Sequence, residues 1–403
     1  MTARRLMAIL ALTLAAGLLM CGCGREPAGP EPGTEEPVNG EVAPPDAPPV
    51  PAGGDAGYVT PGTQAAMDRG IAWLKKAQLD DGGWPMEAGA SKSHLGVTAV
   101  AAHGLLAAGV PADDLAVAKA VTNILGFAKP DGGIYDEGLR NYTTSIALMV
   151  LKAAGEQKHQ EVTKKALKFL VDLQWGEGHG IEQESPDYGG AGYGQNRRPD
   201  LSNTQWLVQA YSAMGLGKDD KPVQNALIFI SRCQAGEAAK GYWTSDGQGG
   251  FVYTPHEGGE SKAGEFVLPS GEKGLKAYGS MTYAGFLSMI YAGLDRTDPR
   301  VMAAREWIER HWTLEENPEL GMQGYFYYLM TMGKALRAHG TATIIDGQGR
   351  THDWRKELSA KLISLQGDDG SWTNPEADRW YEGNPCIATP FALIGLNACK
   401  VKL

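Results

Sequence analysis

Residues able to take part in chemistry gather in two long segments, 175–203 and 235–281, that are rich in glycine and tyrosine. Segments of this length without secondary structure of their own are usually functional or disordered, and the tyrosines argue against disorder. Carboxylates held about 5–9.5 Å apart can hydrolyse glycosides. The candidates for catalysis are Asp187, Asp200, Ser202 and Tyr278. The candidates for ligand binding are Tyr188, Glu260, Lys262 and Tyr283, with Arg379 and Glu382 from the last part of the chain.

Each of these candidates also has a purely structural interpretation, because polar side chains near helix starts often serve as caps. The structural alternatives are a helix cap for Asp200, loop salt bridges for Glu260 with Lys262 and for Arg379 with Glu382, and rim packing for Tyr188 and Tyr278. His103 lies on an apolar stretch, which is typical of a core histidine.

A repeated helix must position these residues. In four segments a threonine is followed eleven residues later by a glycine, which predicts three helical turns ending in a glycine C-cap. The pairs are Thr98 with Gly109, Thr144 with Gly155, Thr204 with Gly215, and Thr282 with Gly293. Related segments surround Tyr328 and Thr389. All six are apolar nearly all round, so we expect them to be buried, with the threonines as caps.

A second kind of helix precedes each buried one and carries a single apolar stripe. In the third, the apolar residues include Val162, Ala166 and Phe169, while lysines fall on the other face. Buried and amphipathic helices therefore alternate six times. A closed ring with an inner and an outer layer satisfies both kinds, whereas an open solenoid needs polar end caps that the sequence lacks. The sequence predicts an all-α fold, an (α/α)6 toroid over residues 61–403.

The inner helices of such a ring begin at one rim. Parallel helix dipoles make that rim electropositive, so we expect it to favour an anionic group. The two long segments lead into this rim, which makes it the predicted location of the site.

The first residues resemble the export signal of a bacterial lipoprotein. Arg4 and Arg5 precede the apolar run 6–20, and Gly22 precedes Cys23. We expect a signal peptide over 1–22, lipidation of Cys23, and a flexible tether rich in proline and acids over 23–60. An ordinary cleaved signal is the alternative. The expected location is the cell envelope, facing the periplasm or exterior, with the membrane as a partner through the lipid anchor.

Composition narrows the classes of partner. The 403 residues carry a formal net charge of −10, which disfavours nucleic acid. The cysteines beyond Cys23 are Cys233, Cys386 and Cys399, an odd number without metal-like spacing. We therefore expect no metal and no cofactor.

Four segments carry a family resemblance. RGIAWLKKAQLDDGGW ends at Trp84, and related copies are KALKFLVDLQ, NALIFISRCQ with GYW, and LISLQGDDGSW. They resemble the repeat of the squalene cyclase and protein prenyltransferase superfamily, which implies the same toroid. The glutamine then closes the outer helix, the glycines form a tight turn, and Trp84, Trp243 and Trp372 are structural.

The catalytic sets of that superfamily are absent. Class II terpenoid cyclases protonate an alkene with the middle acid of D-x-D-D-T-A, and the matching segment keeps Asp200 and Thr204 but has Ser202 and Asn203 in place of the two acids. The prenyltransferase zinc positions correspond to Tyr278, Ser280 and Ala388, none of them a zinc ligand. GGESKAG, YGSMTYAG and RWYEGNP resemble secreted bacterial repeat proteins of this superfamily, which implies no established activity.

Three functions follow as hypotheses. The first is a toroid that binds or acts on an apolar, isoprenoid-like small molecule in its central cavity. The second is a non-catalytic binding or scaffold protein of the envelope. The third is a glycan-active (α/α)6 barrel, which requires a pair of rim carboxylates among Asp187, Asp200, Glu260 and Glu382.

Overall fold

The computed structural model describes residues 60–400, except 88, 156–158, 195–196 and 378. The predicted signal peptide, Cys23 and residues 23–59 of the tether lie outside these ranges. Within them, no helix is long and apolar enough to cross a membrane.

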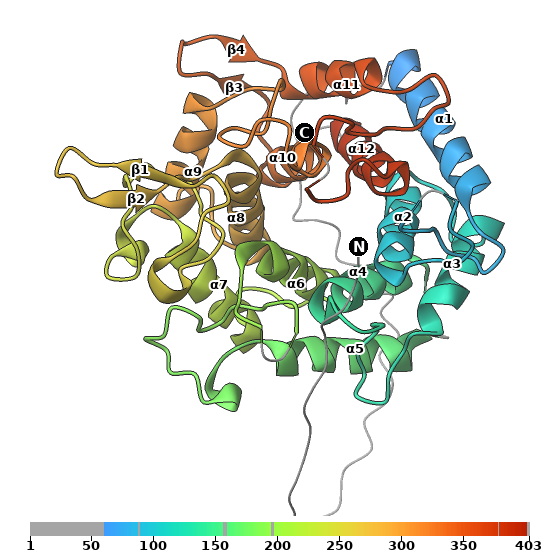
Figure 1. Cartoon of the computed structure of the whole chain (residues 1–403), viewed down its shortest axis with the longest axis horizontal. Helices are drawn as coiled ribbons and strands as arrows, with labels where there is room; N and C mark the ends of the chain where they lie inside the picture. Colours follow the sequence, from blue (N-terminus) through green and yellow to red (C-terminus); the bar gives the residue numbers. More distant parts are fainter. Residues whose placement is uncertain (1–59, 88, 156–158, 195–196, 378, 401–403) are drawn as a thin grey trace, which may run out of the picture. The chain divides into compact units, whose positions relative to one another are not determined.

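The predicted all-α toroid is confirmed: the described residues contain twelve α-helices in two concentric layers (Figure 1). Each inner helix packs against the next, and α12 packs against α2, so the ring closes. The inner helices are α2 (Leu95–Ala107), α4 (Arg140–Ala153), α6 (Leu201–Ala213), α8 (Gly279–Tyr291), α10 (Tyr325–His339) and α12 (Pro385–Cys399). The outer helices are α1 (Pro61–Ala77), α3 (Leu115–Leu125), α5 (Gln160–Leu173), α7 (Lys221–Cys233), α9 (Pro299–Arg310) and α11 (Trp354–Ser364).

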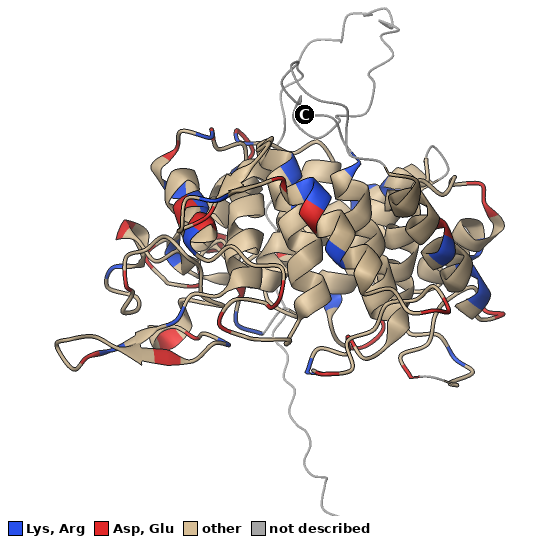
Figure 2. Ribbon diagram, turned by 90° about the horizontal axis from the view of Figure 1, so that it is seen from above, with Lys and Arg blue, Asp and Glu red and all other residues tan. Residues whose placement is uncertain are grey.

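Burial follows the two sequence patterns. In α4, every residue from Thr143 to Leu151 is buried, whereas α5 buries one stripe that includes Ala166, Phe169 and Leu170. Apolar surface on both sides of an inner helix is covered by its neighbours and by the outer layer. Lysine, arginine and acidic residues consequently lie mainly on the outer helices and the loops (Figure 2).

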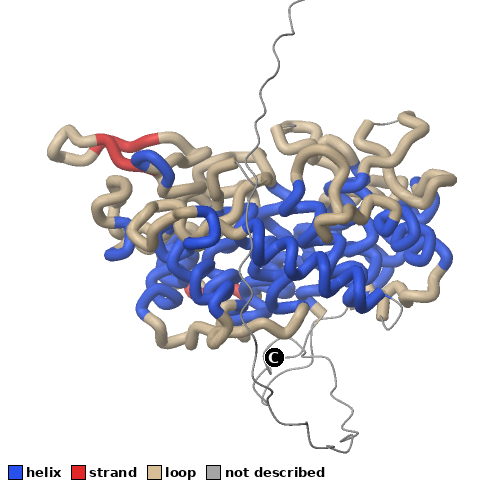
Figure 3. Tube along the Cα trace, turned by 90° about the horizontal axis from the view of Figure 1, so that it is seen from below, coloured by secondary structure: helices blue, strands red, loops and turns tan. Residues whose placement is uncertain are grey.

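The long inserted segments form much of one rim of the ring (Figure 3). They contain the short 3-10 turns Glu177–His179, Glu237–Ala239 and His256–Gly258 and an antiparallel pair, β1 (Glu265–Val267) with β2 (Lys273–Leu275). A second pair, β3 (Ile344–Ile345) with β4 (Thr351–His352), links α10 to α11.

A glutamine at the end of an outer helix joins each of four hairpins to the next. The Nε2 of Gln174 donates to the carbonyl of Gly189 in its own turn, at 2.8 Å, and to that of Pro222 in the next outer helix, at 2.9 Å. Gln78 and Gln234 make the same pair of bonds. Gln366 bonds to Gly370 and to Ala66 of α1, which closes the ring.

The turn beside each glutamine brings backbone against backbone. Gly189 has a φ of +85°, and a Cβ atom there would lie 1.8 Å from the carbonyl oxygen of Asn225 in α7. Only glycine fits this geometry without strain. The predicted structural tryptophans cover the turns: the indole of Trp84 donates to the carbonyl of Leu74, 2.9 Å away, and Trp243 and Trp372 make the equivalent bond.

The repeated threonines hold the loop against the inner helix and do not cap it, which corrects the sequence prediction. The hydroxyl of Thr204 accepts from the backbone N–H of Ala191, at 3.0 Å. Thr98, Thr144, Thr282 and Thr389 accept equivalent N–H groups. The cap, where a side chain supplies one, comes from an earlier residue such as His94 or Asp200.

Replacing Gln174 with leucine tests the junction. Leucine fills a similar volume but leaves two buried carbonyls without a donor, so we expect the free energy of unfolding to fall by roughly 2–4 kcal/mol. Urea unfolding measures the loss. Gln160→Leu, on the exposed face of the same helix, is the matched control and should change stability by no more than about 0.5 kcal/mol. Equal effects of the two substitutions would contradict a role for the junction.

Candidate functional site

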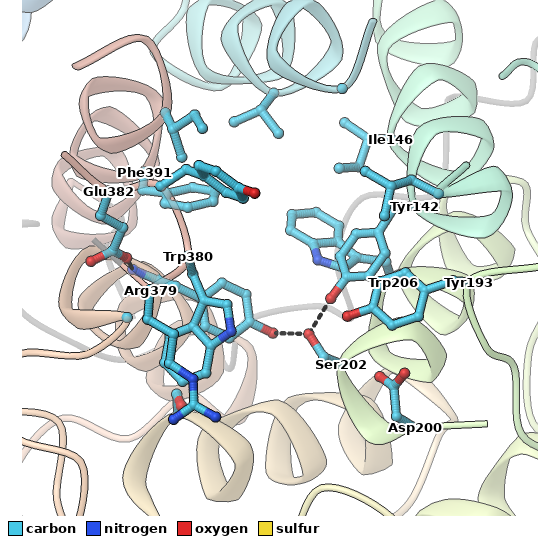
Figure 4. Close-up of a pocket in the computed structure, with 18 of the residues that line it drawn as sticks. Tyr142, Ile146, Tyr193, Asp200, Ser202, Trp206, Arg379, Trp380, Glu382 and Phe391 are labelled. Carbon is cyan, nitrogen blue, oxygen red and sulfur yellow. Dashed lines mark hydrogen bonds between the residues drawn. The ribbon is translucent and has the colours of Figure 1, made fainter. Parts of the chain in front are cut away.

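A cavity of about 580 Å³ lies between the inner helices and opens at the rim where these helices begin. This volume is within the range of small-molecule sites. Aromatic rings form much of its wall, and aliphatic side chains including Val100, Ile146 and Ile387 complete it. The rings belong to Tyr142, Tyr193, Trp206, Tyr253, Tyr278, Tyr327, Trp380, Tyr381 and Phe391. Figure 4 shows several of them directed into the same space.

The wall follows the threonine repeat. Residues two positions before a repeated threonine line the cavity in all five helices that carry one: Gly96, Tyr142, Ser202, Ser280 and Ile387. Residues two positions after it line the cavity in four: Val100, Ile146, Trp206 and Phe391. Apart from Ser202, sequence reasoning missed these residues. The register of the threonines was the signal that could have found them.

Asp200 caps α6, as its structural interpretation predicts. One carboxylate oxygen accepts from the backbone N–H of Asn203 and the other from the Asn203 side chain, both at 2.8 Å. Asn203 in turn accepts from Asn141 on α4, so the carboxylate also fixes the contact between two inner helices. Burial raises the pKa of Asp200 to about 6, although hydrogen bonds from Asn203 and Tyr253 favour the carboxylate.

Ser202 projects into the cavity from the first turn of α6 (Figure 4). Its hydroxyl bonds to the hydroxyl of Tyr142 and lies 3.4 Å from that of Tyr327, which donates to the Gln205 carboxamide. Burial raises the pKa values of both Tyr142 and Tyr327. The group at the position of the cyclase acid is therefore one of several weakly acidic hydroxyls.

Basic residues line the mouth of the cavity. Arg198 and Lys262 both pair with Glu260, which lies just behind the wall, so the predicted pair of Glu260 with Lys262 is present. The Lys262 amine lies 4.2 Å and the Arg198 guanidinium 5.7 Å from the centre of the Tyr253 ring. Arg197 and Arg379 also line the mouth. These cations outnumber the acids facing the cavity, although the chain as a whole is acidic.

Glu382 and Arg379 do not pair with each other, which corrects the suggested salt bridge. Glu382 caps α10: its carboxylate accepts from the backbone N–H groups of Phe326, at 3.1 Å, and Tyr327, at 2.8 Å. Arg379 instead donates to the side chain of Gln323 and lies over the Trp380 ring. Burial raises the pKa of Glu382, whose side chain is 1% exposed.

Four of the ten candidates do not line the cavity: Glu260, described above, and Asp187, Tyr188 and Tyr283. Asp187 binds His256, with 2.8 Å between carboxylate and ring nitrogen, and Tyr188 donates to Glu177. The first contact joins the two inserted loops, and the second lies within the first of them. Tyr283 is buried against Tyr328. Tyr278, in contrast, starts α8 and lines the cavity.

The described residues offer no group of three histidine, cysteine or acidic side chains that could hold a metal ion. Cys233, Cys386 and Cys399 are free thiols, buried in the helical layers.

No protein family and no curated protein matches the sequence. Solved structures match the fold. The type II terpene cyclase MstE from Scytonema, with geranylgeranyl dihydroxybenzoate bound, has 16% identity and a TM-score of 0.52 over 84% of this chain and 96% of the cyclase. The α-1,6-mannanase GH76A from Salegentibacter sp. HEL1_6 has 8% identity and a TM-score of 0.55 over 84% of this chain and 98% of the mannanase. An α-amylase from Clostridium perfringens has 11% identity and a TM-score of 0.52, over 85% of this chain and 99% of the amylase.

These similarities show a terpenoid cyclase-like α/α toroid that glycan-active proteins share. Identities this low establish the fold alone, and one fold supports many chemistries. The candidate functions differ in the side chains that they require in the cavity, so the lining of the cavity distinguishes them.

The raised pKa of Asp200 predicts a specific pH dependence of stability. Between about pH 4 and pH 6, the folded protein keeps a proton on Asp200 that the unfolded chain releases. The free energy of unfolding therefore falls as pH rises through this window, by up to about 3 kcal/mol from this residue. Asp200→Asn cannot titrate, so urea unfolding at pH 4 to 7 should show a smaller decline for it than for the unaltered protein.

Asp219→Asn, at an exposed position, serves as the control and should keep the unaltered pH profile. If Asp200→Asn gives a profile parallel to that of the unaltered protein, Asp200 does not titrate in this window.

Proposed function

We propose that the protein binds an elongated apolar ligand, isoprenoid-like in character, in the central cavity and does not transform it. The observation that carries this proposal is the wall: rings and other apolar side chains from all six inner helices surround about 580 Å³. Burial of apolar surface there stabilises a complex by roughly 25 cal/mol per Å² before the costs of association.

The polar groups of the wall argue against cyclisation. Protonation of an alkene needs a strong acid directed into the cavity, and Ser202 occupies that position. Both oxygens of Asp200 accept hydrogen bonds from Asn203, so the carboxylate is used within its own helix start. The terpene cyclase similarity therefore supports a cavity for an apolar ligand and lends no support to proton transfer.

Glycan hydrolysis has less support. It requires two carboxyl groups that face the substrate. Among the four predicted candidates, only Asp200 and Glu382 line the cavity, and each is engaged by backbone N–H groups at a helix start. Asp187 and Glu260 lie behind the wall in pairs with basic side chains.

The predicted anchor complements this function. Lipidation of Cys23, with a tether over 23–60, would hold the toroid close to a membrane, where apolar ligands concentrate. The cations at the mouth would attract anionic or polar ends of such ligands and repel cationic ones. We therefore propose an envelope binding protein.

Ligand binding can be tested with geranylgeraniol and a cavity-filling substitution. Ile146→Trp replaces an aliphatic side chain of the wall with a bulky ring that fills part of the cavity. We therefore expect the affinity for geranylgeraniol, measured by calorimetry, to weaken by roughly 10-fold or more. The unaltered protein should also gain melting temperature with the alcohol, and mass spectrometry of protein purified without detergent should recover a lipid.

Leu115→Trp is the matched control because Leu115 is 70% exposed on an outer helix, far from the wall. It should bind geranylgeraniol like the unaltered protein. Absence of both lipid and binding, or hydrolysis of an α-1,6-mannan abolished by Asp200→Asn, would overturn the proposal.

A further inference from the structure

A group of hydrogen-bond donors lies one turn deeper in the ring than Trp206. Gln209 is the next residue of α6 on the same face, and Lys334 approaches it from α10, which is not a neighbour of α6 in the ring. The Lys334 amine donates to the Gln209 carbonyl oxygen and lies 5.4 Å from the Trp206 ring centre. His103, five residues after Thr98 on α2, packs edge to face against the same ring at 6.3 Å.

The Gln209 carboxamide has a fixed orientation and an unused donor. An ammonium group only donates, so the carbonyl oxygen of Gln209 must face Lys334. Its Nε2 then points away and has no hydrogen-bond partner, although the residue is 3% exposed. Gln205, one turn earlier and fully buried, likewise has an unpartnered Nε2 while its carbonyl accepts from Tyr327. Unpartnered buried donors are rare because each costs about 1–3 kcal/mol.

The cluster also lacks a countercharge. Among the described residues, no acidic side chain forms an ion pair with Lys334, and Arg337 lies one turn further along α10. His103 on α2 is neutral near pH 7, because burial lowers its pKa to about 3. Burial lowers the pKa of Lys334 to about 7, and Arg337 adds to this effect. The groups that α6 contributes, Gln205, Trp206 and Gln209, carry no charge.

We propose that the Lys334 amine and the free amide of Gln209 bind the carboxylate of an amphiphilic acid whose apolar body occupies the cavity. This inference rests on the proposed function and names the class of ligand. The two donors meet at one carboxamide, because the Lys334 amine donates to its oxygen and its own nitrogen has no partner. We infer that a single carboxylate accepts from both. It accepts only, as the donors require, and it supplies the missing negative charge.

The cavity and the donor cluster adjoin each other. Trp206 and Tyr327 line the cavity, and the same two residues contact Lys334 and Gln205. An acid that enters past the cationic mouth therefore finds rings along its chain and an amine at its end. A neutral alcohol can use one donor and leaves the charge of Lys334 unmatched. The acid should be preferred for this reason.

Paired probes test the site on the full chain: hexadecanoic acid and hexadecanol, titrated at pH 6. The unaltered protein should bind the acid roughly 10-fold more tightly than the alcohol, because hydrogen bonds to charged groups are the stronger ones. Lys334→Met should remove this preference and leave alcohol binding within about 2-fold. Gln209→Leu should reduce the preference for the acid in part. Raising the pH from 6 to 9 should weaken binding of the acid alone, because Lys334 loses its charge.

The controls separate the possible failures. Lys262→Met removes a cation from the mouth and tests the other position at which the cavity could bind a carboxylate. If it abolishes the preference while Lys334→Met does not, the carboxylate is bound at the mouth and the inference is wrong. Equal binding of the acid and the alcohol would also overturn the inference, but the proposed function would stand. If neither compound binds, the proposed function itself is contradicted. Displacement of the acid by millimolar acetate would assign the cluster to small acids instead. Asp200, which lines the cavity, also titrates near pH 6, so the pH titration is repeated with Asp200→Asn. This titration decides even if Lys334→Met fails to fold.

Discussion

The glutamine junction at the end of four of the six outer helices is the constraint on which the toroid depends. One glutamine amide satisfies the carbonyl of its own glycine turn and that of the following outer helix, so neighbouring hairpins share a buried polar contact. The glycine is required because the turn touches the next helix backbone, as Gly189 does at Asn225. Since Gln366 makes this bond to Ala66, the last hairpin is joined to the first, and the ring has no free end.

A ring held together at its periphery leaves its interior free to vary. The repeated threonines fix the rotation of each inner helix by binding the loop backbone, as Thr204 does with Ala191. Rotation then decides which positions face the cavity: those two residues before and two after the threonine. Side chains at these positions can change without loss of the junctions. Because the frame and the wall are separate, this chain can share its fold with a terpene cyclase at 16% identity and with a mannanase at 8%.

The same separation decides what could be predicted from the sequence. Thr282 and Gly293 lie on one helix, and the glutamine and tryptophan of a repeat lie close together in the chain, so local patterns were sufficient for the fold. Contacts across the cavity are not local: Gln209 and Lys334 are 125 residues apart. Tyr283 illustrates the limit, because it directly follows Thr282 but points into the layer between helices. Asp187 was misleading for another reason, since its partner His256 lies in the other inserted loop.

The charges of the interior are the opposite of those that a cyclase needs. A cyclase must hold a carboxyl group able to lose its proton to an alkene, and the surroundings of such an acid must accept the negative charge it leaves. Here Ser202 lies among tyrosine hydroxyls, and the deeper cluster contains an amine without a carboxylate partner among the described residues. An interior of this kind stabilises negative charge that a ligand brings with it and provides no strong acid to donate a proton. The physical chemistry of the wall therefore favours retention of an acidic amphiphile over conversion of a hydrocarbon.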